Sequence, residues 1–176
     1  MPNRTLRTTA LAVLILFAAV PDARSDVLVG VIHRLPESMV NFTWGDGEND
    51  LTQRWTVRNE NSAGWFYGLD YTWSNCDVYV YADLNDPTVV TDASVFPYES
   101  GAVWATEGST VFFRGANGYY GAWYVDDIYS PGDPDDPIAA YLDGVWYFVT
   151  DQSADFSQGT VAAELQTLSG VKALFD

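Results

Sequence analysis

The sequence has very few of the residues on which most metal, redox and acid–base sites depend. It contains one cysteine, Cys76, one histidine, His33, and eight Lys and Arg together, of which only one is lysine. A lone cysteine excludes an internal disulfide, so stability must come from the packed core. No H-E-x-x-H, G-x-S-x-G or Gly-rich phosphate loop occurs. We expect Cys76 to be a small buried apolar residue and His33 to be structural.

Long hydrophobic runs are also missing. The one sizeable run, 10–20, follows Arg4 and Arg7 and is shorter than the roughly 20 apolar residues that span a bilayer. Ala23 and Ser25 are small residues suited to positions −3 and −1 of a cleavage site. The pattern predicts a signal peptide over 1–25 with cleavage near Ser25. It also predicts a secreted or periplasmic domain over 26–176 that does not insert into membrane.

Positive charge is scarce, whereas acid is abundant. The net charge is −16, and loss of 1–25 leaves 5 basic and 23 acidic side chains, a net charge of −18. Such a surface repels phosphate backbones, which excludes nucleic acid as a partner. The acids are 18 Asp against 6 Glu. Because Asp favours turns and Glu favours helices, the bias predicts many turns and few helices.

The sequence is rich in residues that favour β-strands: short runs of β-branched and aromatic residues are separated by Gly, Asp, Asn and Pro. The expected strands are 27–33, 39–44, 53–58, 64–73, 77–82, 94–97, 102–106, 109–115, 119–128, 138–142 and 145–150. The pattern predicts an all-β fold, a single antiparallel β-sandwich that is jelly-roll-like, with one short C-terminal helix over 159–170. The six residues WYVDDI (123–128) resemble a strand found near the end of several jelly-roll carbohydrate-binding and adhesion domains.

Three turn signals organise these strands. Asn117-Gly118 and Asp143-Gly144 predict two-residue type I′ hairpins, and 45–50 predicts a longer turn between two aromatic strands. The first hairpin pairs Phe112 with Trp123, and both of its faces then carry large aromatics. Either these strands are covered on both sides, or one face presents aromatics to a partner.

Aromatic side chains are the first candidates for function. Trp, Tyr and Phe make 15% of the chain, and a flat ring suits the C–H face of a sugar. The candidate ligand-binding residues lie on the central hairpin, and a second group lies upstream. They are Tyr119, Tyr120, Trp123 and Tyr124, then Trp65, Tyr67, Tyr71 and Trp73. The alternative for each ring is a place in the core.

The acidic loop after that hairpin is the second candidate. Asp126, Asp127, Asp133, Asp135 and Asp136 could supply oxygen ligands to Ca²⁺. The loop lacks the glycine and distant Glu of the helix-loop-helix calcium motif, and Asp-Pro steps make turns without metal. A calcium site and a solvated loop therefore both remain open.

Three classes of function follow. The leading one is a non-catalytic module that binds a polysaccharide or glycan, which should expose a short row of rings with Asp or Asn beside it. The second is an assembly protein of the cell surface or matrix that binds other copies of itself, which should expose an apolar patch or an open sheet edge. The third is a glycan hydrolase or lyase, which should have a cleft with a carboxylate of raised pKa.

Overall fold

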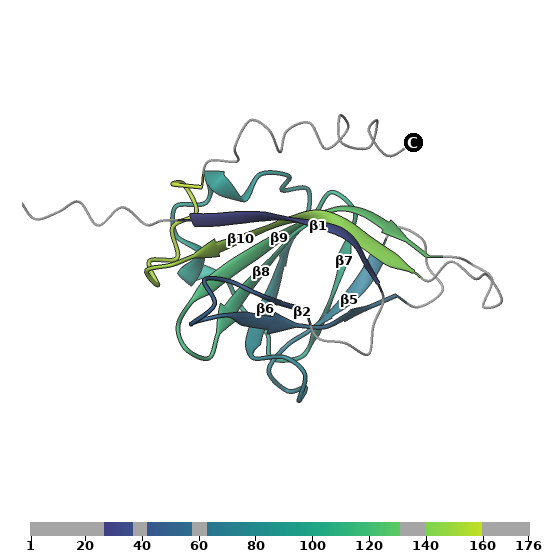
Figure 1. The fold of residues 1–176 in the computed structure, drawn as a ribbon, viewed down its shortest axis with the longest axis horizontal. Helices are drawn as coiled ribbons and strands as arrows, with labels where there is room; N and C mark the ends of the chain where they lie inside the picture. Colours follow the sequence, from purple (N-terminus) through teal and green to yellow (C-terminus); the bar gives the residue numbers. More distant parts are fainter. Residues whose placement is uncertain (1–26, 37–41, 58–62, 131–139, 160–176) are drawn as a thin grey trace, which may run out of the picture.

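The computed structural model describes residues 27–36, 42–57, 63–130 and 140–159, and these confirm the all-β prediction (Figure 1). They form antiparallel sheets of five, two and three strands and contain no α-helix. Nor do they form any helix long and apolar enough to cross a bilayer. The leader expected over 1–25 lies outside the described residues, as does the helix expected over 159–170 beyond Gly159.

The largest sheet has the strand order β1-β10-β9-β8-β6. Its strands are β1 (Val27–Pro36), β10 (Tyr141–Val149), β9 (Tyr120–Tyr129), β8 (Thr110–Gly115) and β6 (Cys76–Tyr81). One small sheet pairs β2 (Phe42–Trp44) with β3 (Leu51–Gln53), across the long turn that the sequence predicts. The other joins β4 (Trp55–Thr56), β5 (Ala63–Tyr67) and β7 (Ala102–Thr106).

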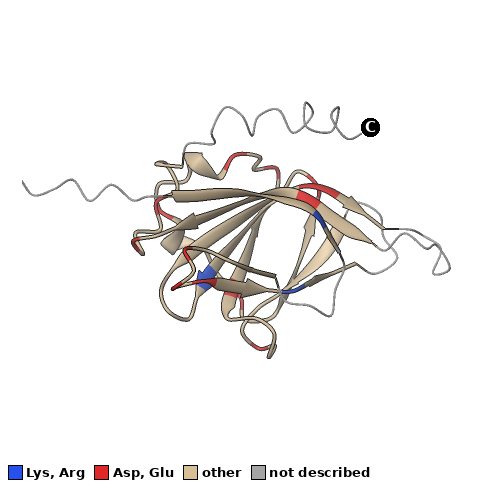
Figure 2. Ribbon diagram, viewed as in Figure 1, with Lys and Arg blue, Asp and Glu red and all other residues tan. Residues whose placement is uncertain are grey.

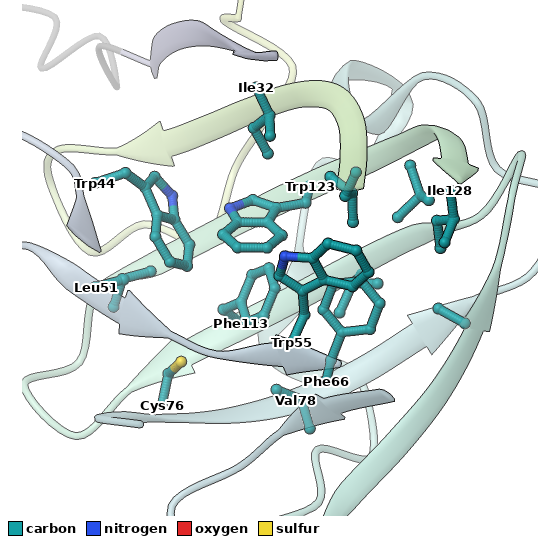
Figure 3. Close-up of a cluster of buried hydrophobic side chains, with 14 of the residues drawn as sticks. Ile32, Trp44, Leu51, Trp55, Phe66, Cys76, Val78, Phe113, Trp123 and Ile128 are labelled. Carbon is teal, nitrogen blue, oxygen red and sulfur yellow. The ribbon is translucent and has the colours of Figure 1, made fainter. Parts of the chain in front are cut away.

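The larger of two cores draws its side chains from all three sheets. Trp44 comes from the two-stranded sheet, Trp55 and Phe66 from the three-stranded sheet, and Phe113 and Trp123 from the five-stranded sheet (Figure 3). Each is buried, with at most 4% of its surface exposed. One continuous core therefore holds the three sheets together.

A second core lies on the opposite face of the five-stranded sheet, so that this face is covered as well. Phe112, Ala122 and Tyr147 of this sheet pack there against Ala93 and Phe156, which come from two loops. Backbone hydrogen bonds join those loops, from Ala93 N to Ala154 O at 2.9 Å and from Phe156 N to Val90 O at 2.9 Å. The sheet is therefore covered on both faces, which explains why its strands are aromatic on both sides.

Short 3₁₀ turns build the first of these covering loops. They are η1 (Pro87–Val89) and η2 (Ala93–Val95), and the Asp before each accepts a hydrogen bond from a backbone N–H of its turn. The strand predicted over 94–97 is therefore wrong. Asp92 caps the turn by accepting from Ser94 N at 2.9 Å, the local hydrogen bonding that draws Asp and Ser away from strands.

The predicted register of the central hairpin is wrong by one residue. Arg114 pairs with Tyr120 and Val111 with Trp123, so the loop has three residues, 116–118, instead of two. A type I′ turn needs positive φ at both central residues, but only Gly118 has it, at +85°. The slip moves Trp123 to the same face as Phe113, in the larger core, and away from Phe112.

The hairpin predicted at Asp143-Gly144 does not exist, because β10 runs straight through both residues. The pairing of β10 with β9 instead shifts there, leaving Asp126 as the extra residue of a bulge. A Cβ on Gly144 would lie 2.2 Å from the carbonyl oxygen of Tyr124. Glycine is therefore needed here for a close backbone approach within the sheet.

Candidate functional site: an outer aromatic face

Trp123, one of the four hairpin residues predicted to bind a ligand, lies inside the larger core. Its ring centroid is 4.8 Å from that of Trp44 and 5.2 Å from that of Phe113, and none of its surface is exposed (Figure 3). A ring with no exposed surface cannot stack on a sugar from solvent. We therefore leave Trp123 out of the candidate site.

The other three hairpin candidates are not brought together either. Tyr119 stacks on Phe148 at 5.7 Å and packs against the larger core. Tyr120 and Tyr124 pack against the second core, on the opposite face of the sheet, and burial raises the pKa of Tyr124. The four predicted residues thus divide between two faces of one sheet and form no common surface.

The structure places only part of the predicted calcium loop. Asp126 is exposed at the bulge and Asp127 is half-buried, whereas Asp133, Asp135 and Asp136 lie outside the described residues. Within the described ranges, no group of three or more His, Cys, Asp and Glu side chains is arranged to hold a metal ion. Calcium binding by this loop stays a prediction.

The second group of predicted aromatics does come together, on the outer side of the three-stranded sheet. Side chains alternate along a strand, so Trp65 and Tyr67 point away from the core that Phe66 enters. Trp65 pairs directly with Trp104 of β7, and their ring centroids are 4.9 Å apart. Both indoles are half-exposed, and neither belongs to a core.

Two further rings extend this surface beyond the end of β5. The chain turns after Tyr67 and brings back Tyr71 and Trp73, whose centroids lie 4.8 and 5.9 Å from that of Tyr67. All three are half-exposed. The close approach of Gly68 to the Ser100 carbonyl fixes the turn, since a Cβ there would be 2.5 Å from that oxygen. We call Trp65, Tyr67, Tyr71, Trp73 and Trp104 the outer aromatic face.

Polar groups accompany these rings. The guanidinium carbon of Arg54 lies 4.7 Å from the ring centroid of Trp73, a cation–π contact. Thr56 Oγ1 lies 2.8 Å from the hydroxyl of Tyr67. Asp70 is exposed in the turn that carries Tyr71. The surface therefore combines flat apolar rings with side chains that can donate to and accept from hydroxyl groups.

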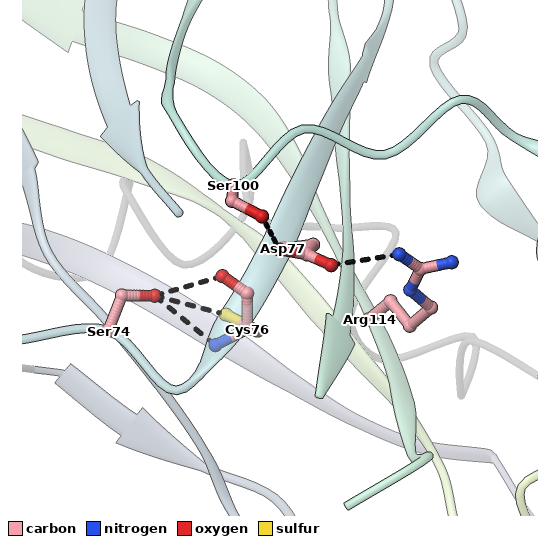
Figure 4. A network of polar contacts seen from close by, with 5 residues as sticks. All are labelled: Ser74, Cys76, Asp77, Ser100 and Arg114. Atoms are coloured by element: carbon pink, nitrogen blue, oxygen red, sulfur yellow. Dashed lines mark hydrogen bonds and ion pairs between the residues drawn. The ribbon is translucent and has the colours of Figure 1, made fainter. Parts of the chain in front are cut away.

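A separate polar network next to β6 has its hydrogen bonds satisfied within the fold (Figure 4). Asp77 accepts from Arg114 Nη2 at 2.8 Å and from Ser100 Oγ at 2.7 Å. The ion pair raises the pKa of Arg114, and the guanidinium also lies 4.8 Å from the ring centroid of Tyr98. These contacts tie the segment around Ser100 to the edge of the five-stranded sheet, which is a structural role.

Cys76 and His33, the only cysteine and the only histidine of the sequence, differ widely in exposure. Cys76 is completely buried, and its desolvation raises the pKa of the thiol to about 12. His33 is exposed on β1, with Nδ1 3.2 Å from Asp143 Oδ1. The buried position of Cys76 agrees with the sequence prediction.

In comparisons with known proteins, no family model, curated protein or solved structure matches the chain. Sequence reasoning grouped four rings of the outer aromatic face and missed Trp104. A signal was present, because Trp104 is the central residue of a strand whose bounds were predicted correctly.

Proposed function

We propose that this protein is an exported, non-catalytic carbohydrate-binding module that holds a polysaccharide on the outer aromatic face. The observation that carries the proposal is the grouping of five half-exposed rings outside both cores. Stacking on such rings removes the C–H face of a sugar from water, while its hydroxyls bond polar side chains at the rim. Arg54 and Thr56 are polar side chains in contact with these rings, and Asp70 is exposed next to Tyr71 in the sequence.

The remaining parts of the proposal concern the fold and the location. The packing of all three sheets around one core supports a β-sandwich, and a jelly-roll arrangement is the class we propose for it. Export rests on the leader predicted over 1–25. Calcium bound by Asp126, Asp127 and the acids that follow would be a structural addition to the loop.

Retention of the purified exported protein on insoluble polysaccharides tests the binding surface. Trp65→Ala and Trp104→Ala each remove one half of the exposed indole pair and should weaken binding by about tenfold or more, as aromatic anchors do. Tyr81→Ala is the matched control, because Tyr81 is 43% exposed but lies on another sheet. It should bind like the unmodified protein.

Two further variants separate this surface from the hairpin. Tyr120→Ala and Tyr124→Ala should keep full binding, because their rings pack against the second core. Loss of binding in these variants but not in Trp65→Ala would move the site to the hairpin. Absence of binding across neutral and acidic polysaccharides would reject the function. Loss of retention in EDTA, restored by Ca²⁺, would assign a role to the acidic loop.

A further inference from the structure

Among the described strands, β1 leaves one edge of the five-stranded sheet open. β1 pairs with β10 along one side, and the described residues place no backbone hydrogen bond on its other side. The opposite edge, β6, is partly covered by the chain itself. There Val78 N donates to Glu99 O at 2.9 Å, and Glu99 N donates to Val78 O at 2.8 Å.

The open edge is protected at only one end. Proteins block sheet edges with bulges, prolines, charges or short strands. The C-terminal end of β1 has a register shift after Ile32, Arg34 with φ at 46°, and Pro36. The first six residues, 27–32, have none of these devices: they are apolar and pair regularly with β10. Such a segment is a template for another strand.

The sequence of this segment is close to symmetric, which suits pairing with a second copy of itself. LVGVI (28–32) has Gly30 at its centre, with Val29 and Val31 on either side, then Leu28 and Ile32. A two-fold axis at Gly30 would set valine opposite valine and leucine opposite isoleucine. A symmetric dimer interface requires this self-complementarity, since each patch meets its own copy.

The two faces of the strand also match under this symmetry. Ile32 enters the larger core, and alternation places Leu28 on that same side. Val29 packs against the second core, and alternation places Val31 with it. Residues directly opposite in an antiparallel pair share a face, so the pairing about Gly30 extends both layers without exposing polar groups to apolar ones.

Trp146 supports the same axis. A Cβ on Gly30 would lie 2.3 Å from Trp146 Cε2, so the indole of Trp146 lies across Gly30. This indole is half-exposed. Aromatic cover of an edge glycine is a known means of pinning register. Two copies paired about Gly30 would bring two such indoles to the axis.

Charge favours this edge over other surfaces for contact between copies. With a net charge of −16, two molecules repel one another over most approaches. β1 contains no Asp or Glu and is tan along nearly all of its length (Figure 2). We propose that the protein self-associates through β1, antiparallel about Gly30, so that two five-stranded sheets join into one of ten strands. This surface is separate from the outer aromatic face.

Sedimentation equilibrium over micromolar to millimolar concentrations tests the association. Leu28→Lys places a charge on the open edge at a residue that is 37% exposed, and it should shift the dimerisation constant at least tenfold toward monomer. Leu69→Lys is the matched control, with the same substitution at 38% exposure on another surface. It should dimerise like the unmodified protein. A monomer at every concentration, or equal weakening by both lysines, would overturn the proposal.

Cysteine cross-linking tests the register, and Cys76 does not interfere because it is buried. Under the proposed axis Val29 of one copy lies opposite Val31 of the other, at a Cα separation of about 4.5–5.5 Å, within disulfide range. An equimolar mixture of Val29→Cys and Val31→Cys proteins should oxidise to a covalent dimer. Each protein alone should not, because the diagonal separation is about 7–8 Å. Equal cross-linking of a single variant would refute the Gly30 axis.

Discussion

Truncation of Trp123 to alanine is the sharpest test of the core. Trp123 is fully buried, and four aromatic rings surround it. Its ring centroid lies 4.8 Å from Trp44, 5.2 Å from Phe113, 5.4 Å from Phe42 and 5.9 Å from Phe66. These neighbours come from three sheets, so the cavity would open at the point where the sheets meet.

The size of the effect follows from this burial. Trp→Ala in a core costs about 3–5 kcal/mol, and ring pairs add about 0.5–1.5 kcal/mol each beyond their area, which favours the upper half of the range. For a domain of this size about 1 kcal/mol lowers Tm by about 2–4 °C, so a loss in the upper half of that range should lower Tm by about 8–20 °C. Trp104→Ala, half-exposed with one ring neighbour, should cost less than about 2 kcal/mol.

Urea unfolding followed by far-UV circular dichroism measures both variants, with Tm from thermal scans. The reasoning requires Trp123→Ala to be clearly less stable than Trp104→Ala. It also requires any loss of polysaccharide binding by Trp123→Ala to disappear under conditions where that variant is folded. A loss below about 1 kcal/mol for Trp123→Ala would refute the central position assigned to this ring.

Three other perturbations test separate parts of the structure. Because burial raises the Cys76 thiol pKa to about 12, a thiol reagent at neutral pH should modify the native protein far more slowly than the urea-unfolded protein, and rapid native labelling would contradict that burial. Hydrogen bonds from the backbone N–H and side chain of Asn49, and then from the backbone N–H of Glu48, hold the pKa of Asp46 below its ordinary 3.8. The ionised Asp46 therefore stabilises the fold above that value, and this stabilisation is lost as pH falls through the folded pKa. Asp46→Ala should therefore lower Tm near neutral pH and have little effect in strong acid, and equal losses at both would refute the assignment. Gly68→Ala forces a Cβ to 2.5 Å from the Ser100 carbonyl oxygen, so it should destabilise the fold by about 1–3 kcal/mol and disturb the outer aromatic face. Gly101→Ala, whose Cβ would have nothing within 4 Å, should leave Tm nearly unchanged in the same thermal scans.

Local chemistry was enough to place many elements. The strand over 102–106 was predicted with its observed bounds, and the long turn at 45–50 follows the predicted strand that contains β2. The strand after the turn was placed too late, because β3 is Leu51–Gln53 and shares only Gln53 with the expected strand 53–58. Both the strand and the turn are encoded by residue types within a few positions of one another. A strand needs alternating β-branched and aromatic side chains, and a turn needs Gly, Asp and Asn.

The two sites at which Gly predicted a hairpin, Gly118 and Gly144, show where local residue preferences are insufficient. The carbonyl of Asn117 accepts from Gln152 Nε2 at 3.1 Å, and its side chain donates to Asn49 O at 3.2 Å. These partners lie 35 and 68 residues away, so no local pattern reports them. At Gly144 the glycine serves a close approach to β9 instead of a turn.

The sequence by itself determined the all-β class, the acidic charge, the absence of disulfides and the supply of aromatic rings, because these depend on composition and short periods. Only the tertiary structure decided which rings are buried. Alternation assigns Trp123 and Tyr124 to opposite faces of β9, but it does not say what covers each face. Distant loops cover one face and two smaller sheets cover the other, so the rings of the outer aromatic face are those of β5, β7 and the turn after β5.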